Sequence, residues 1–193
     1  FISRRFIIKP TQPFSYYSIN LIRRIYMRKY LPHVLIISFV FILTPACDVA
    51  KTVEEKIEIE LEDYKEEVRK NPDDALAHYH LGQAYLYAYK YEKAILSYKQ
   101  AIRIDPDFAA AYHNLGISYR MTRSWKSGEK ALEKAVVLYK KTIRINPDDV
   151  SAHYPLGLAY LILNDRDSAI DQYKILKKLD TELANELFNK IYK

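Results

Sequence analysis

The one thiol of the 193-residue chain, Cys47, lies where an apolar run ends and an acidic segment begins. Residues 42–48 read ILTPACD, with small and apolar residues before the cysteine and an aspartate after it. A single cysteine excludes an intramolecular disulfide, and one thiol cannot by itself build a structural zinc site. Cys47 is therefore either a site of modification or incidental to function.

Carboxylates and imidazoles are the other groups that could do chemistry, and their spacing favours structural roles. Aspartates gather at residues 73–74, 105–107 and 148–149, without the spacing or the bidentate glutamate of an EF-hand. We expect them to form turns and helix starts. The five histidines show no metal-binding spacing, and His78 and His153 occupy equivalent positions of the repeat described below. We expect both to be structural.

Sequence motifs of catalysis are missing. The glycines are isolated, so no glycine-rich phosphate loop is present. Residues 116–118 read GIS and lack the second glycine of a nucleophile elbow. Because no nucleophile with a positioned base is visible, we expect no enzymatic activity, no metal and no cofactor.

The formal net charge of +6 arises in the N-terminal part of the chain. Residues 1–46 contain seven Lys and Arg and no acid, whereas residues 47–193 contain 23 basic and 24 acidic residues. A nucleic-acid-binding domain needs a basic stripe on its folded part. We therefore expect no nucleic-acid partner.

A repeat of 34 residues organises the chain after about residue 72. A glycine, a tyrosine and a proline series recur at intervals of 34 and then 41 residues, while an alanine and a second tyrosine series reverse this order. The glycines are Gly82, Gly116 and Gly157, and the alanines are Ala94, Ala135 and Ala169. One unit therefore occurs three times, and this pattern places seven extra residues between Tyr119 and Ala135.

Each unit reads as a helical hairpin. In the first unit, one helical face carries His78, Leu81, Gly82 and Tyr85, and a face of the next helix carries Ala94, Tyr98, Ala101 and Ile104. We expect Gly82 and Ala94 to be small because two backbones approach closely there. This pattern resembles the tetratricopeptide repeat (TPR). The resemblance implies an all-α fold, a right-handed superhelical solenoid of antiparallel helix hairpins with about three repeats and flanking capping helices.

The repeat sets the expected domain boundaries. We expect TPR units over residues 75–181, divided as 75–108, 109–149 and 150–181. A solenoid needs helices that cover its apolar ends, and residues 57–72 and 182–193 have the apolar periodicity for that role. In the third unit, we expect Pro155 to lie in about the first turn of its helix, where a missing N–H costs little.

The seven extra residues correspond to two helical turns, which nearly restore the same helix face. We expect one lengthened helix that protrudes from the stack and begins near Trp125, the only tryptophan. Two interpretations of Trp125 remain open. It packs in the hairpin turn, or it marks a contact surface.

The first helices of such a superhelix line a concave groove. From the helical period, the candidate peptide-binding residues are Tyr79, Gln83, Leu86, Tyr87, His113, Asn114, Ile117, Arg120, Met121, Tyr154, Leu158 and Leu161. Their largely apolar character suits capture of an extended or helical peptide, with Arg120 available for a carboxylate. The alternative is that a tight superhelix or a terminal helix covers these side chains.

Co-chaperone members of the family bind a terminal carboxylate through a clamp of lysines, asparagines and a further cation. The corresponding places here hold Tyr79, Gln83, Asn114, Ser151 and Pro155. Only Asn114 matches, so we do not expect recognition of a chaperone tail by that clamp.

The N-terminal third has the features of a targeting sequence. From Met27, two cations precede an apolar run over residues 34–43 and a short small-residue end, which is typical of a secretory signal peptide over residues 27–46. The cysteine that follows resembles the lipobox of bacterial lipoproteins, which implies lipid attachment at Cys47 and a tether over residues 47–56. Thr44 and Pro45 depart from that pattern. Alternatives are an uncleaved signal anchor and an ordinary cleaved signal.

Residues 1–26 begin without methionine, and we assign them no fold. We interpret them as an upstream extension, although their basic, acid-free composition faintly resembles an organellar transit peptide.

Together these features predict a membrane-anchored adaptor that binds a protein or peptide in a bacterial cell envelope, in an assembly or secretion process. One alternative is a structural repeat domain on an uncleaved anchor that forms homo-oligomers. Another is an organellar TPR protein with a cleaved presequence.

Overall fold

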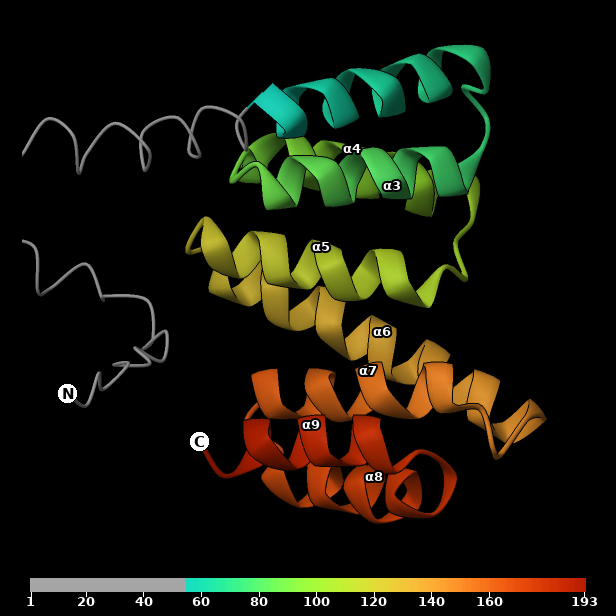
Figure 1. Cartoon of the computed structure of the whole chain (residues 1–193), viewed down its shortest axis with the longest axis vertical. Coiled ribbons are helices and arrows are strands. Elements are labelled where there is room, and N and C mark those ends of the chain that lie inside the picture. Colours follow the sequence, from blue (N-terminus) through green and yellow to red (C-terminus); the bar gives the residue numbers. More distant parts are fainter. Residues whose placement is uncertain (1–54) are drawn as a thin grey trace, which may run out of the picture. The chain divides into compact units, whose positions relative to one another are not determined.

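The structure, a computed structural model, describes residues 55–193, which form a stack of antiparallel helices without strands (Figure 1). The expected upstream extension, the signal peptide and Cys47 lie outside the described residues. A helix over residues 55–70 opens the described part of the chain. The remaining helices are α3 (Ala75–Tyr87), α4 (Tyr91–Ile104), α5 (Ala109–Met121), α6 (Trp125–Ile145), α7 (Val150–Ile162), α8 (Arg166–Leu179) and α9 (Thr181–Ile191).

The turns inside the three hairpins share one geometry. Each has three residues, and its central residue adopts the left-handed conformation, with φ of 58° at Tyr89, 60° at Arg123 and 63° at Asn164. After α3, the N–H of Lys90 donates to the Tyr85 carbonyl (2.8 Å) and that of Tyr89 to the Leu86 carbonyl (3.1 Å). This is a Schellman motif, which pairs the last carbonyls of the helix.

The turns between hairpins are built by aspartates, as expected. The side chains of Asp74, Asp149 and Asp180 accept hydrogen bonds from backbone N–H groups of the first helical turn that follows. Two histidines complete these turns, because His78 Nε2 lies 2.9 Å from the Pro72 carbonyl oxygen and His153 Nε2 lies 2.8 Å from that of Pro147. Both histidines therefore have a structural hydrogen bond, as their equivalent repeat positions predicted.

Glycines mark the close helix crossings. A Cβ atom on Gly82 would lie 2.6 Å from Tyr98 Cε1, and one on Gly116 would lie 2.6 Å from Leu132 Cγ. Real Cβ atoms do not approach other atoms this closely, so any larger residue would push the helices apart. Ala94 is fully buried at the same crossing as Gly82. The expected close approach at Gly82 and Ala94 is confirmed.

The seven extra residues lengthen α6, but at a different place from the one predicted. As expected, α6 is one helix of 21 residues, against 14 for α4 and α8. The hairpin turn before α6 has the ordinary length, and Leu132 contacts Gly116 as Tyr98 contacts Gly82. The extension therefore lies at the C-terminal end of α6, after Leu138, and not between Tyr119 and Ala135. A heptad shift keeps the same helix face inward, which made the two placements equivalent in the sequence pattern.

Two apolar clusters form the core, and α6 contributes to both. The first joins α4 and α5 to Ala131, and the second runs from Leu132 and Tyr139 through α7 and α8 to Leu187 and Ile191 of α9. α9 packs on α8 and α7 and covers the apolar end of the stack.

Pro155 lies deeper in its helix than predicted. It is the sixth residue of α7, so the Ser151 carbonyl lacks its intrahelical N–H donor. Ser151 is exposed, and water can therefore bind that carbonyl.

Candidate functional site

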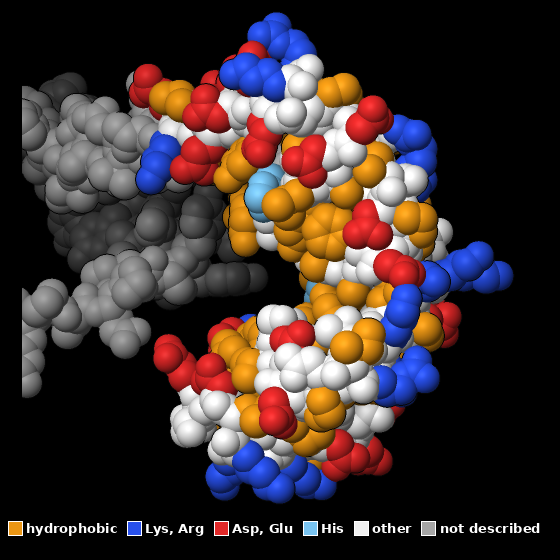
Figure 2. All heavy atoms as spheres, turned by 90° about the vertical axis from the view of Figure 1, so that its right-hand side faces the viewer, with side chains coloured by type: hydrophobic (Ala, Val, Ile, Leu, Met, Phe, Trp, Pro, Cys, Tyr) orange, Lys and Arg blue, Asp and Glu red, His pale blue; other side chains and the backbone are white. Residues whose placement is uncertain are grey.

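The concave side of residues 55–193 is formed by the first helices of the hairpins. α3, α5, α7 and α9 contact one another in sequence, whereas α4, α6 and α8 make no direct contacts with one another. The first helices therefore lie on the inner side of the curve. Figure 2, which looks along the helices, shows that the stack curves around a hollow with hydrophobic side chains on its wall.

Tyr79 of α3 is the centre of a polar cluster on this inner side. Its hydroxyl oxygen accepts hydrogen bonds from Asn114 Nδ2 of α5 (3.2 Å) and from Gln83 Nε2 (3.1 Å). These bonds occupy both lone pairs of the oxygen and leave its O–H hydrogen to donate. The Tyr79 ring packs against that of Phe108, with ring centroids 4.9 Å apart. The sequence pattern did not select Phe108. The cluster links the first two repeats and offers hydrogen-bonding groups beside apolar surface.

His113 was expected at the groove surface, and this expectation is wrong. Its side chain is 6% exposed and packs edge-on against Tyr139, with ring centroids 6.3 Å apart. Burial lowers the pKa of His113 to about 4, and its Nδ1 has no hydrogen-bond partner among the described residues. The ring is therefore a neutral part of the core. The helical period alone placed it one position too far around the helix.

Burial also raises the pKa of two core tyrosines, Tyr98 and Tyr139. The Tyr98 hydroxyl is buried without a hydrogen-bond partner among the described residues. Both phenols therefore stay protonated at any physiological pH. They stabilise the hairpins through packing and take no part in charge recognition.

Arg120 lies toward one end of the groove and is not alone there. Its guanidinium lies over the ring of Trp125, 5.2 Å from the centroid. Tyr87 and Met121, the last residues of α3 and α5, are exposed at the same end of the helices. These three predicted groove residues therefore lie at the rim of the hollow, whereas Tyr79, Asn114 and Ile117 lie further along the helices.

The third repeat contributes an apolar wall. Tyr154, Leu158 and Leu161 are half-buried and pack against the second core cluster. Burial and the carboxylate of Glu186 raise the pKa of the Tyr154 phenol, which places α9 beside this wall. Sequence reasoning missed Glu186, because it treated the last helix only as a cap. Gln83 and Leu86 of α3 are likewise half-buried. These groove side chains therefore pack partly against the core and remain partly exposed to solvent.

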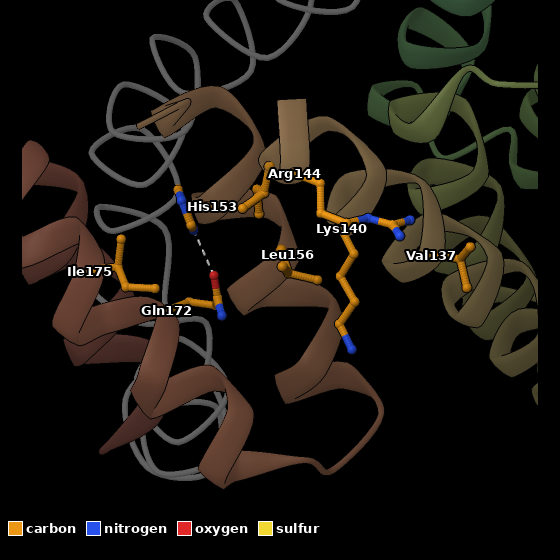
Figure 3. A pocket seen from close by; sticks show the side chains of 8 residues that line it. Val137, Lys140, Arg144, His153, Leu156, Gln172 and Ile175 are labelled. Atoms are coloured by element: carbon orange, nitrogen blue, oxygen red, sulfur yellow. Dashed lines mark hydrogen bonds between the residues drawn. The ribbon is translucent and has the colours of Figure 1, made fainter. Parts of the chain in front are cut away.

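A second hollow lies between α6, α7 and α8. This cleft of about 510 Å³ is lined by Val137, Lys140, Ile143, Arg144, His153, Leu156, Gln172 and Ile175 (Figure 3). His153 Nδ1 lies 2.7 Å from the Gln172 side-chain amide, which ties α7 to α8 at its floor. His153 and Gln172, the polar groups at its floor, already have partners.

Residues 55–193 contain no group of three or more His, Cys, Asp and Glu side chains placed to hold a metal ion. Within the same residues, no helix combines the length and the apolar character that crossing a bilayer requires.

Comparisons with known proteins agree with this architecture. A family model described as a TPR repeat matches residues 90–121 and 129–164. The structure resembles that of a thermophilic TPR protein from Thermus thermophilus, with a TM-score of 0.54, 24% identity, and coverage of 74% of this chain and 78% of that one. It also resembles the Cut9–Hcn1 hetero-tetramer of the APC/C, with a TM-score of 0.51, 18% identity, and coverage of 74% and 28%. No curated protein matches the chain.

The part of the chain from residue 90 to residue 164 therefore matches TPR repeats, and the expected fold class, an all-α solenoid of the TPR type, is confirmed. Repeats of this kind act as scaffolds for protein–protein interaction and are generally not catalytic.

Proposed function

We propose that these TPR repeats bind an extended peptide or a partner helix in the concave groove, and that the protein acts as an adaptor in this way. The observation that carries the proposal is the composition of the inner helix faces. Leu86, Ile117, Leu158 and Leu161 supply apolar surface there, and the Tyr79–Asn114–Gln83 cluster supplies hydrogen-bonding groups. Apolar pockets beside a few fixed polar groups are the combination that peptide recognition requires.

The ligand that this groove favours is apolar with few charges. Arg120 is a cation at the rim of the groove and stacks on Trp125, whereas Glu186 of α9 adds a negative charge beside Tyr154. Only one position, Asn114, matches the carboxylate clamp of co-chaperones. We therefore propose an internal peptide segment or a helix as the ligand, and not a free C-terminal carboxylate.

The proposed location is the membrane surface of a bacterial cell envelope, with Cys47 as the lipid attachment site. Its support is the order of cations, apolar run and cysteine over residues 27–47. An assembly or secretion process is the proposed setting. A repeat domain that oligomerises on an uncleaved signal anchor is the alternative.

Membrane fractionation of cells that express wild type or Cys47→Ala tests the anchor. If Cys47 carries the lipid, the substitution releases the protein from membranes. An uncleaved signal anchor would hold the variant in the membrane fraction, which would contradict lipidation.

A groove variant tests the binding function. We expect Ile117→Ser/Leu158→Ser to lose the partners that crosslink to wild type in cells, because both side chains line the groove. The matched control is Leu96→Ser/Val137→Ser, which alters two exposed aliphatic residues on second helices. Thermal unfolding of each variant shows that it is folded. Equal partner sets for groove variant and control would contradict the proposal.

A further inference from the structure

The exposed aromatic side chains of residues 55–193 all lie at one end of the helices. We call this surface the aromatic rim. It comprises Tyr87, Tyr89, Met121, Trp125, Phe188 and Tyr192. The exposed fractions are 71% for Tyr87, 77% for Tyr89, 56% for Trp125 and 55% for Tyr192. The rim is formed by the turns inside the hairpins and by the end of α9, which face the same side of the stack (Figure 1).

Cations accompany these aromatic residues. Lys90, Arg123, Lys126 and Arg166 are exposed in or next to the hairpin turns. Arg120 lies over Trp125, and Arg166 lies over the Tyr192 ring at 5.0 Å from its centroid. Each pair holds an amphipathic ring and a guanidinium together at the surface.

The turns at the opposite end of the helices are acidic. The turns between hairpins, residues 71–74, 105–108, 146–149 and 180, contain seven aspartates and no Lys or Arg. The three turns inside hairpins contain Lys90, Arg123 and Asp165 as their charged residues. The turns therefore differ in charge, from basic turns at the aromatic end to acidic turns at the other, whereas the helix ends beside them carry charges of both signs, with Glu55 and Glu58 near the rim and Lys177 near the acidic turns.

Folding does not require a tyrosine at position 89. Tyr89 adopts a left-handed backbone conformation, in which glycine is favoured and a tyrosine is costly. Its ring is also largely in water, so packing does not offset this cost. A residue that is unfavourable in both respects indicates a role outside the fold.

We propose that the aromatic rim is a membrane-contact surface that lies against an anionic lipid bilayer. Tyr and Trp rings are favoured at the membrane–water interface, where their apolar part meets the acyl chains and their polar part meets the headgroups. Each Lys or Arg near an anionic surface adds about 1 kcal/mol of attraction. The aspartates of the turns between hairpins then point away from the bilayer.

The course of the chain places the rim within reach of such a surface. The helix over residues 55–70 begins at the rim end of the stack (Figure 1). Cys47 precedes residue 55 by eight residues, which span at most about 26–29 Å when extended. This step alone rests on the proposed lipid anchor, and the composition of the rim stands without it.

Trp125 provides the test, because it is the only tryptophan and lies in the rim. The full chain is mixed with vesicles of phosphatidylcholine alone or of phosphatidylcholine with phosphatidylglycerol. Tryptophan emission, acrylamide quenching and quenching by lipids brominated on the acyl chain are recorded. We expect a blue shift, less acrylamide quenching and quenching by brominated lipid on the anionic vesicles.

Charge variants separate the rim from the anchor. Lys90→Glu/Arg123→Glu/Lys126→Glu reverses three rim cations, and Arg69→Glu/Lys70→Glu/Lys177→Glu reverses three exposed cations at the acidic end. We expect the first variant to lose the Trp125 signal and the second to keep it, while sedimentation with vesicles at high salt reports the anchor separately. A Trp125 signal without sedimentation at high salt would support the rim and contradict the anchor.

Two results would overturn the membrane-contact surface. In the first, the chain sediments with vesicles, but acrylamide still quenches Trp125 fluorescence and brominated lipid does not. In the second, the blue shift appears without vesicles as protein concentration rises, which would assign the rim to contact between copies of the chain.

Discussion

His113 gives the molecule a pH dependence that a single residue explains. Burial lowers its pKa to about 4, whereas an unfolded chain keeps the ordinary value near 6.5. Below pH 6.5 the unfolded chain binds a proton that the folded chain does not bind, so the free energy of unfolding falls as the pH falls. The contribution of neutral His113 to the free energy of unfolding is complete above about pH 6.5. It is lost progressively as the pH falls to about 4, by up to about 3 kcal/mol.

We predict that His113→Leu removes this part of the pH dependence. Leucine fills a similar volume and leaves no unpaired ring nitrogen in the core. Urea unfolding at about pH 7 and about pH 4.5 measures the difference between wild type and variant. His80→Leu, at a half-buried histidine, is the matched control. An equal loss of stability between the two pH values in wild type and in His113→Leu would show that His113 is accessible to protons in the folded state.

Gly82 tests the close approach of α3 and α4. We predict that Gly82→Ala lowers the free energy of unfolding by about 1–3 kcal/mol, because the new methyl group overlaps the fully buried ring of Tyr98. Thermal unfolding followed by circular dichroism measures the effect, with Gln100→Ala on the exposed face of α4 as the control. If Gly82→Ala were as stable as wild type, the crossing would be looser than described.

At the scale of the element, Pro155 lowers the stability of α7, because it lies inside the helix. Proline in a helix interior removes one hydrogen bond and is about 3 kcal/mol less favourable than alanine. We predict that Pro155→Ala stabilises the protein by about 1–3 kcal/mol, because the Ser151 carbonyl regains an N–H donor. The denaturant concentrations at the midpoints of unfolding of wild type and Pro155→Ala measure this difference. A destabilised variant would mean that the half-buried proline ring contributes more through packing than the hydrogen bond does.

The extension of α6 leads to a deletion experiment. We predict that removal of residues 139–145 leaves a folded protein of lower stability, since Leu138 then precedes Asn146 as Ile104 precedes Asp105. Seven residues are nearly two turns, so the apolar face is kept. Removal of residues 139–143 takes out 1.4 turns at about 3.6 residues per turn, and this control should not fold cooperatively. Equal behaviour of the two deletions in circular dichroism and gel filtration would contradict the assignment of the extension.

The sequence was sufficient for the helices, the 34-residue unit and the close crossings, because each depends on spacing along the chain. It could not decide which end of α6 is longer, since Leu132 and Tyr139 are one heptad apart and face the same way. It also misplaced His113, because the helical period gives a direction but not the depth of burial. Phe108 and Glu186 were missed since their neighbours come from other helices.

At the scale of the whole molecule, residues 55–193 present distinct surfaces in different directions. The concave side is apolar with a polar cluster at Tyr79, one end of the helices exposes aromatic residues and basic turns, and the turns at the other end are acidic. A solenoid allows this separation, because each repeat contacts only its neighbours and its exposed positions vary freely. A peptide in the groove and a bilayer at the rim would therefore occupy different faces and could bind at the same time.

The central claim is that the groove binds a protein segment, and site-specific photo-crosslinking in cells tests it most directly. A photoreactive amino acid replaces Ile117 on the concave side or, in a matched protein, Leu96, which is 62% exposed on α4. We predict that adducts with other proteins form from position 117 and are absent or different from position 96. The same adducts from both positions, or adducts only between copies of this chain, would contradict the claim.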